Sequence, residues 1–468
     1  MPDLGQIWVS SPEAMDRLGL PASVEVFGER VLSKSDRRAA AGKAFDAMAE
    51  LPVVRAALEQ GWQLGQGGRL DAWTRVWHPQ LLPGGAWLVF VPWQRLDELA
   101  LLAPETGQES LHPAVLADRL AAFAQTVGVS WRLSSAATGL DLIDHTRPPR
   151  RSAEDERGAS RRRVALVRGV AAELPPFLRT STDHRFSRLE ADFSWWRPWS
   201  KLLAAEKRLP FVIAFDRNAS YLSPWTSIEL GVEGLVHVSG EDADWDGSEK
   251  PGYYLVDAWD WDCWWLPDPG EAAGAGVGGG KVWVTVHTLR QLRAAGITPV
   301  VHEAYRWSTS SRYLESAGGK LKVARESLPK GPVLDTVKSV YATTVGKLAE
   351  REHRADFHLY RPDWRHHIIA ATRTAILHTL RQVHDACGAA PLVVDRDLIA
   401  YASPTGDPSE FWPEQLRGKL SGSIGGWKPA GVADLPEWGP QYLRRRTKGA
   451  YFPYKDAADA MREQGGPA

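Results

Sequence analysis

The stretch LPFVIAFDRNASYLS (209–223) contains an apolar run that ends on a lone carboxylate, Asp216. Such a run predicts a buried strand, and a carboxylate at its end is costly unless it is paired or binds a cation. A second stretch, PLVVDRDLIAY (391–401), predicts two apolar strands with Asp395 and Asp397 in the tight turn between them. Three carboxylates placed in this way could converge on a divalent metal ion. The alternative is that they are ordinary turn aspartates with exposed side chains.

Strands and helices are predicted on both sides of these two stretches. Apolar, β-branched and aromatic runs predict further strands at 85–93, 252–259, 281–287 and 298–307. Helical periodicity predicts helices at 112–128, 288–296, 333–352 and 364–386. One face of the helix at 333–352 carries the apolar side chains of Leu334, Val337, Tyr341, Val345 and Leu348. This mixture of elements, without an internal repeat, predicts an α+β fold.

The length and the cysteine content restrict the class of protein. A chain of 468 residues can form two or three compact domains. Its two cysteines, Cys263 and Cys387, form no CxxC pair, which indicates a reducing setting and speaks against a structural zinc site. Neither a signal peptide nor an apolar run long enough to span a membrane is visible, so we expect a cytoplasmic protein without a membrane partner.

Charge and aromatic residues are unevenly distributed. The net charge is −1, but a nucleic-acid groove needs only local positive charge. Basic residues crowd the segments 144–163 and 444–448, and the first of these is interpreted as a linker or a mobile surface loop. Most of the 22 tryptophans are expected to fill cores, although some could stack on unpaired bases. The glycine-rich segment 272–281 is expected to be a flexible hairpin tip. Phosphate binding is not expected there, because the segment lacks the strand–turn–helix order of a phosphate loop.

Segment 215–223, FDRNASYLS, resembles the first palm motif of family B DNA polymerases, particularly of the protein-primed branch. Asp216, Asn218 and Tyr221 fit this motif, whereas Leu222 stands where the family has proline.

Segment 338–348, KSVYATTVGKL, resembles the second motif of the family. Ala342 and Val345 replace its usual asparagine and tyrosine. The positions that do fit are Lys338, Thr343, Gly346 and Lys347.

Segment 393–401, VVDRDLIAY, resembles the third motif, Asp-Thr-Asp-Ser, and keeps both of its carboxylates. Arg396 and Leu398 stand in place of the threonine and the serine. Arg396 could neutralise the two carboxylates or point away from them toward a phosphate.

Flanking segments extend the resemblance over roughly residues 186–455, in the order found in the family. EADFSWW (190–196) stands where the family links its exonuclease to its palm, and the segment 425–452 resembles the strand that grips the template–primer duplex. SAATGLDLID (135–144) is similar to a segment of actinobacterial telomere-associated proteins, which work with a terminal protein at the ends of linear replicons.

The resemblance implies a right-hand polymerase with palm, fingers and a small thumb, preceded by an RNase H-like domain derived from an exonuclease. The implied divisions are a degenerate exonuclease-like domain at 1–145, a linker at 146–185, a palm with an insertion at 186–330, fingers at 331–389, the third-motif part of the palm at 390–425, and a thumb segment at 426–468. The N-terminal part lacks an Asp-x-Glu signature, and Asp118 and Asp141 are its possible remnants. We therefore expect no proofreading.

The resemblance also implies a role for each matching residue. Asp216 and Asp397 would hold two Mg²⁺ (or Mn²⁺) ions, with Asp395 as a supporting carboxylate. Nucleotide-binding positions would be Asn218, Tyr221, Lys338 and Ala342, with Tyr221 rejecting a 2′-hydroxyl and Lys338 reaching the phosphates. DNA-binding positions would be Arg446, Lys448 and Tyr451. The alternatives are that Tyr221 is a core tyrosine and that Lys338 is a solvated lysine on a helix. For Arg446, Lys448 and Tyr451 the alternative is a solvated basic strand.

The implied function is DNA-directed DNA synthesis at replicon ends, as protein-primed initiation or end-patching. Its partners would be single-stranded or primer–template DNA, dNTPs and a terminal protein, in the nucleoid. The alternative is a polymerase-derived scaffold without catalysis, which binds telomeric DNA and recruits the terminal protein. The altered Ala342, Val345 and Leu398 favour the scaffold, whereas the retained aspartates favour the enzyme.

Overall fold

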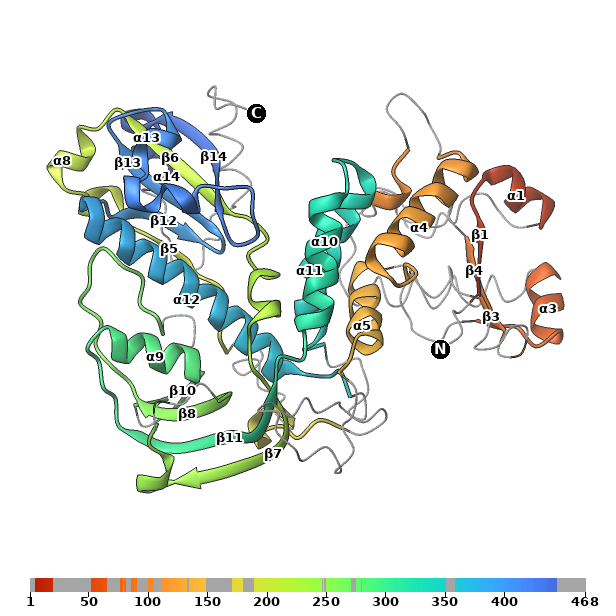
Figure 1. Ribbon diagram of the computed structural model, residues 1–468, viewed down its shortest axis with the longest axis horizontal. Coiled ribbons are helices and arrows are strands. Elements are labelled where there is room, and N and C mark those ends of the chain that lie inside the picture. Colours follow the sequence, from red (N-terminus) through yellow and green to blue (C-terminus); the bar gives the residue numbers. More distant parts are fainter. Residues whose placement is uncertain are drawn as a thin grey trace, which may run out of the picture. The chain divides into compact units, whose positions relative to one another are not determined.

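The computed structural model describes residues 5–19, 52–64, 76–78, 80, 86–90, 100–104, 111–132, 134–148, 171–179, 189–245, 247, 250–270, 275–278, 280–350 and 358–443. The chain divides into two compact units (Figure 1). The first comprises Met1–Thr138 and Val323–Ser339, and the second comprises Gly139–Lys322 and Val340–Ala468.

The first unit contains a four-stranded sheet of order β1-β4-β3-β2. Its strands are β1 (Gly5–Val9), β2 (Gln63–Leu64), β3 (Val76–His78) and β4 (Ala86–Phe90). β1 runs parallel to β4, and the other pairs are antiparallel. β4 confirms the strand predicted at 85–93.

Helices of the first unit begin and end at the residues that their sequences favour. The helices that lie wholly within it are α1 (Pro12–Arg17), α3 (Pro52–Glu59), the 3₁₀ turn η4 (Ala100–Leu102) and α4 (Pro113–Val127). In α4, proline stands at the first position and Gly128 adopts a left-handed φ of 82° after the last turn. The helix predicted at 112–128 is therefore confirmed.

The second unit is built on a five-stranded antiparallel sheet of order β14-β6-β13-β12-β5, which we call the aspartate sheet. Its strands are β5 (Ser194–Trp196), β6 (Phe211–Arg217), β12 (Pro391–Asp395), β13 (Leu398–Ser403) and β14 (Trp427–Asp434). The buried strand predicted at 209–216 and the hairpin predicted at 390–403 are both confirmed. β14 belongs to the segment predicted as a thumb, and it pairs directly with β6.

Apolar side chains cover both faces of the aspartate sheet, because its central strands are apolar at successive positions. On one face, Ile213 and Phe215 pack with Ile376 and Leu380 of α12 (Pro362–Cys387). On the other face, strand residues pack with Leu435 and Trp438 of α14 (Leu435–Tyr442). Asp216 therefore follows β6 residues that are buried from both sides.

A second sheet of this unit has the order β7-β11-β8-β10-β9 and antiparallel pairing. Its strands are β7 (Leu230–Ser239), β8 (Gly252–Asp257), β9 (Ala275–Gly278), β10 (Lys281–Thr285) and β11 (Val301–Ser311). The strands predicted at 252–259, 281–287 and 298–307 are confirmed as β8, β10 and β11. The prediction of a mere hairpin tip at 272–281 was wrong for 275–278, because these residues pair with β10 as an edge strand.

The helices α9 and α12 connect the two sheets of the second unit. α9 (Val286–Ala294) begins two residues before the predicted 288 and ends just before Gly296, whose φ is 82°. α12 packs on the aspartate sheet through one face and on α9 through another, so it lies between the two sheets (Figure 1). Its predicted bounds, 364–386, fall within the observed helix, which Gly388 ends at a φ of 71°.

Three helices cross the division between the units. They are α10 (Glu315–Ser327), α11 (Pro332–Lys347) and α5 (Ser135–His145). α11 ends earlier than the predicted 352, after Gly346, a residue of low helix propensity. All five apolar side chains predicted on one face of this helix are buried.

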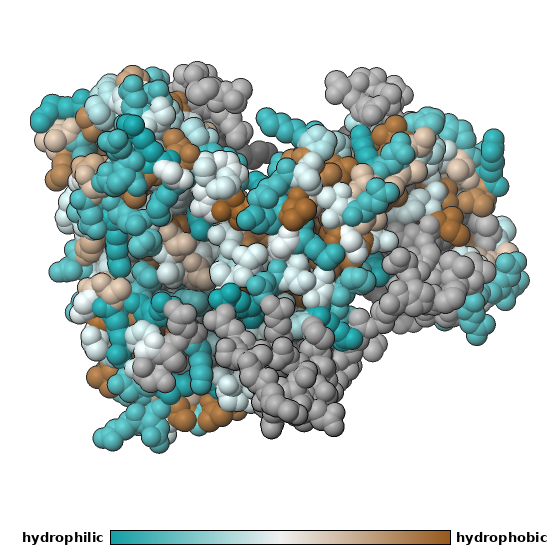
Figure 2. Space-filling view, in the orientation of Figure 1, coloured by the Kyte–Doolittle hydropathy of each residue, from teal (hydrophilic) through white to brown (hydrophobic). Residues whose placement is uncertain are grey.

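Short elements complete the described chain: α6 (Pro176–Arg179), η5 (Trp199–Lys201), α8 (Ala204–Lys207), η6 (Ser223–Thr226), η7 (Gly240–Ala243), α13 (Pro408–Phe411) and η8 (Glu414–Lys419). No helix among the described residues is long and apolar enough to span a membrane. On the face drawn in Figure 2, hydrophobic residues of the second unit are scattered among hydrophilic ones.

Candidate functional site

Strand register brings the three predicted aspartates to one end of the aspartate sheet. Asp216 on β6 lies directly opposite Leu398 of β13, and Leu398 in turn pairs with Asp395 of β12. The backbone N–H of Arg217 donates to the carbonyl oxygen of Asp397 at 2.8 Å. The prediction of Asp216 at the end of an apolar strand and of Asp395 and Asp397 at the connection of an apolar hairpin is therefore confirmed.

Asp397 and Asp216 form a pair of interacting carboxylates. Burial, followed by the negative charge of Asp216, raises the pKa of Asp397 to about 7. A hydrogen bond from the backbone and the charge of Lys428 act in the opposite direction. Two like charges in a poorly solvated place favour either a proton or a cation between them.

Asp395 belongs to a different pair. Burial raises the pKa of Asp395 to about 6, with a smaller raising effect from Asp192 and a lowering effect from Arg396. The hairpin turn separates Asp395 from Asp397, because Arg396 between them adopts a left-handed φ of 55°. Among the described residues no group of three or more His, Cys, Asp or Glu side chains is arranged to hold a metal ion. The possible convergence of the three aspartates on a metal ion therefore stays a prediction, and Asp216 and Asp397 are the two carboxylates that interact most directly.

Asp192 is a site residue that the sequence reasoning missed. It lies just before β5, whose residue Ser194 pairs with Asp395. Its charge acts on Asp395, Asp397 and Tyr221. The signal was present in EADFSWW, where a carboxylate borders an aromatic strand, as at the other two strands.

Tyr221 is held beside these carboxylates. Burial, followed by the charge of Asp192 and a hydrogen bond to its carboxylate, raises the pKa of the Tyr221 phenol. Arg365 of α12 also interacts with Asp192 and Tyr221, and burial lowers the pKa of its guanidinium. The phenol therefore stays protonated at neutral pH and can donate a hydrogen bond.

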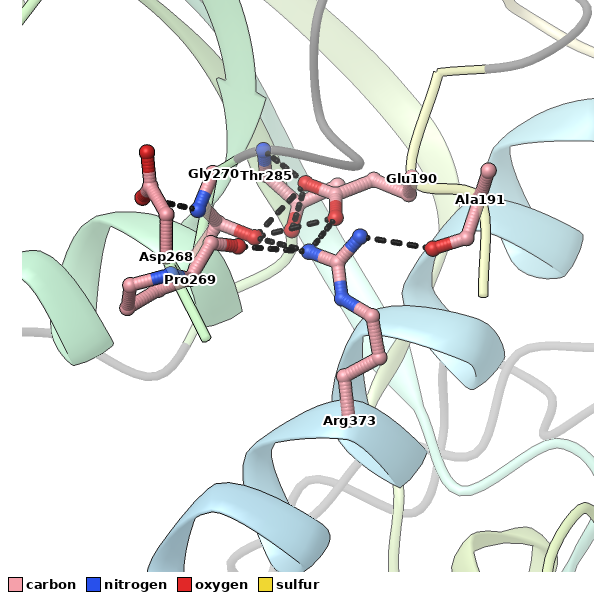
Figure 3. A network of polar contacts seen from close by, with 8 residues as sticks. Glu190, Ala191, Asp268, Pro269, Gly270, Thr285 and Arg373 are labelled. Carbon is pink, nitrogen blue, oxygen red and sulfur yellow. Dashed lines mark hydrogen bonds and ion pairs between the residues drawn. The ribbon is translucent and has the colours of Figure 1, made fainter. Parts of the chain in front are cut away.

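A buried polar network fixes the segment that carries Asp192 (Figure 3). Glu190 is fully buried and forms an ion pair with Arg373 of α12. Its carboxylate accepts hydrogen bonds from the backbone N–H and the hydroxyl of Thr285, at 2.9 and 2.8 Å, and from the hydroxyl of Thr288. Arg373 also donates to the carbonyl oxygen of Ala191 at 2.8 Å. One network thus joins the lead into β5 to β10, α9 and α12.

Asn218 holds a loop instead of facing open space. Its side-chain amide donates to the carbonyl oxygen of Ser423 at 3.1 Å, and its backbone exchanges hydrogen bonds with Gly425 and Gly426. Gly425 has a φ of 78°, and a Cβ there would meet the Ser223 hydroxyl oxygen at 2.7 Å. The loop therefore packs closely on the end of β6, and the predicted contact of Asn218 with a nucleotide stays a prediction.

Arg217 is a buried cation on the opposite face of β6 from Asp216. Its guanidinium donates to the hydroxyls of Ser220 and Ser223 at 3.4 and 3.2 Å. Burial lowers the pKa of Arg217 to about 10, and the charge of Asp397 opposes this shift. Arg217 thus stays charged at neutral pH behind the carboxylate pair.

The remaining predicted site residues are Lys338, Ala342, Arg446, Lys448 and Tyr451. Lys338 belongs to the first unit, where its ammonium pairs with Asp335 at 2.7 Å. Ala342 is exposed on α11. Arg446, Lys448 and Tyr451 lie outside the described residues. Their predicted roles therefore stay predictions.

The possible exonuclease remnants lie on helices. Asp118 is exposed on α4, and Asp141 is partly buried on α5. Neither follows a strand, and the expectation of no proofreading stays a prediction.

Backbone strain accompanies the carboxylates. The non-glycine residues with positive φ in the described part of the chain are Glu190, Ala219 and Arg396, at 57°, 51° and 55°. Each lies within three positions of an aspartate at the site. Left-handed residues of this kind are costly and tend to cluster at functional sites.

The carboxylate pair fits a divalent ion whose remaining ligands are water or the phosphates of a bound molecule. Mg²⁺ is commonly held by one or two carboxylates together with substrate phosphates and water. Asp216 and Asp397 supply two hard oxygen donors whose mutual repulsion such an ion relieves. No third protein ligand completes a cage among the described residues.

Comparisons with known proteins gave one family model and several similar solved structures. A family model, a domain of unknown function (DUF8841), matches residues 3–132. No curated protein matches the chain. Phi29 DNA polymerase complexed with primer–template DNA is 12% identical with a TM-score of 0.48, over 77% of this chain and 68% of that chain. The same enzyme complexed with single-stranded DNA is 12% identical with a TM-score of 0.48, over 78% and 68%. Its ternary complex with incoming nucleotides is 11% identical with a TM-score of 0.46, over 77% and 68%.

Proposed function

We propose that this chain is a metal-dependent DNA polymerase acting at replicon ends, in protein-primed initiation or end-patching. The observation that carries the proposal is the Asp216–Asp397 pair. Asp216 lies on β6, Asp397 lies in the turn that leads into the adjacent strand β13, and the two carboxylates interact. The colinear motifs at 215–223, 338–348 and 393–401 support it. Divalent ions bound with the substrate would lower the pKa of a primer hydroxyl and stabilise the departing pyrophosphate.

The surrounding residues of the chain have positioning roles in this proposal. Asp216 and Asp397 supply the oxygen donors. Pairing of β6 with β13, together with the hydrogen bond from the Arg217 backbone N–H to the Asp397 carbonyl oxygen, holds their backbones side by side. Tyr221, fixed by its hydrogen bond to Asp192, forms a wall against a sugar 2′-hydroxyl. Lys338 supplies a point charge for the triphosphate.

Primer extension tests the proposal directly. The purified chain would be given a labelled primer–template, each dNTP, and Mg²⁺ or Mn²⁺, with and without a terminal protein. We expect incorporation that falls at least about a hundredfold in Asp397→Asn, because the charge that stabilises the ions is lost. Asp385→Asn, which removes an exposed carboxylate from α12, is the matched control and should retain the rate.

A second candidate function is a DNA-binding scaffold without catalysis. It is favoured by the ion pair between Lys428 and Asp216, which already neutralises one proposed metal ligand. In this case no mixture supports incorporation, and DNA binding is unchanged by Asp397→Asn. That pair of results would contradict the polymerase.

A further inference from the structure

Lys428 lies against the carboxylate of Asp216, which is one of the two proposed metal ligands. β14 pairs with β6 so that Lys428 lies directly opposite Asp216, and both side chains therefore project from the same face of the sheet. The Lys428 ammonium lies 2.9 Å from a carboxylate oxygen of Asp216. This distance is that of a direct ion pair, and an ammonium group there takes up an oxygen that a metal ion needs.

The charge of Lys428 also acts on the second carboxylate. It lowers the pKa of Asp397, against the raising effects of burial and of Asp216. A single lysine therefore partly neutralises both members of the pair. A divalent ion at the same place would have to overcome the repulsion of this ammonium group or displace it.

The side chain of Lys428 is free to leave while its backbone stays in place. It is 52% exposed, whereas the Asp216 side chain is 17% exposed. The backbone is anchored by pairing with β6, so displacement requires only rotation of a long, flexible side chain. A lysine suits this behaviour better than an arginine, which would bind the carboxylate through two parallel hydrogen bonds.

We propose that Lys428 is a resident counter-cation of the Asp216–Asp397 pair, which a divalent metal ion displaces when it binds. Lys428 then keeps the substrate-free site neutral enough to remain folded, and it sets the metal concentration at which the site fills. This inference rests on the proposed metal site but not on polymerase activity.

Manganese binding to the full chain tests the inference without any substrate. Free Mn²⁺ would be titrated by electron paramagnetic resonance at pH 8 and low salt, for the wild type, Lys428→Met and Lys428→Arg. Removing one positive charge beside a divalent ion should tighten binding roughly tenfold in Lys428→Met. Lys428→Arg keeps the positive charge, and arginine binds a carboxylate more strongly than lysine does. Its affinity for Mn²⁺ should therefore equal or fall below that of the wild type. Added salt should shrink the difference.

Two controls make the result specific. Lys322→Met removes an exposed lysine from α10 and should leave Mn²⁺ affinity unchanged. Asp216→Asn removes the partner of Lys428, and in this background Lys428→Met should have a clearly smaller effect. Circular dichroism would verify that each variant is folded. The Lys428 variants are expected to fold, because the Lys428 side chain is half-exposed.

Unchanged or weaker Mn²⁺ binding in Lys428→Met overturns the inference, and so does an absence of Mn²⁺ binding in every variant. Tighter binding in Lys428→Met without any primer extension would leave the counter-cation standing and overturn the polymerase instead. The two proposals can therefore fail separately.

Discussion

At the scale of the residue, Asp397 shows how position in the sheet changes the chemistry of a carboxylate. It is buried next to Asp216, and its pKa of about 7 lies far above that of an aspartate in an unfolded chain. The folded state therefore binds a proton that the unfolded state has released between about pH 4 and pH 7. Ionised Asp397 is a cost to the fold, which is consistent with a functional role.

Replacing Asp397 by asparagine should stabilise the metal-free protein at high pH. Because the folded pKa is raised, stability falls as pH rises from about 4 to about 7, and Asp397→Asn removes this loss. In EDTA, we expect its free energy of unfolding to exceed that of the wild type by about 1–3 kcal/mol at pH 8 and by less at pH 5. Urea denaturation at several pH values measures the difference. Curves for Asp397→Asn that run parallel to those of the wild type at every pH would contradict the burial of the Asp397 carboxylate.

The left-handed backbone at Arg396 should make glycine more stable than alanine at this position. Its φ of 55° is unfavourable for a residue with a Cβ, whereas glycine adopts it freely. Both substitutions remove the same charge next to Asp395, so the backbone effect is isolated. Arg396→Gly should be more stable than Arg396→Ala by about 1 kcal/mol. Equal midpoints in urea would show that this turn is not strained.

At the scale of the element, α12 contacts both the aspartate sheet and the segment that leads into β5. One of its faces packs on the aspartate sheet, and Arg373 on the same helix reaches the buried Glu190 that leads into β5. The position of Asp192 therefore depends on a helix far away in the sequence.

Breaking this network on one side should be costly. Arg373→Met leaves the carboxylate of Glu190 buried without its cation, and we expect a loss of about 3–5 kcal/mol in the free energy of unfolding. The double variant Glu190→Gln/Arg373→Met should lose less than the sum of the two single variants, because neither charge is then left alone. Urea denaturation of all four proteins completes the cycle. Additive losses would show that the two side chains do not act as a pair.

At the scale of the whole molecule, each unit has buried residues of its own. In the first unit Phe123 and Val127 of α4 are fully buried, and in the second unit Trp438 and Ile213 are fully buried. Units with separate cores can unfold in separate transitions.

Thermal unfolding followed by calorimetry should therefore show two transitions. Phe123→Ala, which deletes a buried ring from α4, should lower one of them through a loss of about 3–5 kcal/mol. Arg373→Met should lower the other. A single transition that both substitutions shift equally would mean that the two units unfold together.

Local sequence patterns predicted much of this architecture. The apolar runs before Asp216 and Asp395 predicted the buried strands β6 and β12. The helical periodicity at 333–352 predicted α11, a helix with one buried face. Gly128 and Gly388 end their helices because glycine accepts a left-handed backbone. These features depend on residues a few positions apart, so they can be read from the chain alone.

The composition of the site depends on non-local pairing. The charge of Asp192 acts on Asp395 because β5 pairs with β12, and Lys428 meets Asp216 because β14 pairs with the other side of β6. A shift of one residue in either register would turn these side chains to the opposite face. The sequence therefore identified the aspartates at strand ends. Strand order and register decided which residues lie beside these aspartates, which carboxylates interact, and that Lys428 forms an ion pair with Asp216.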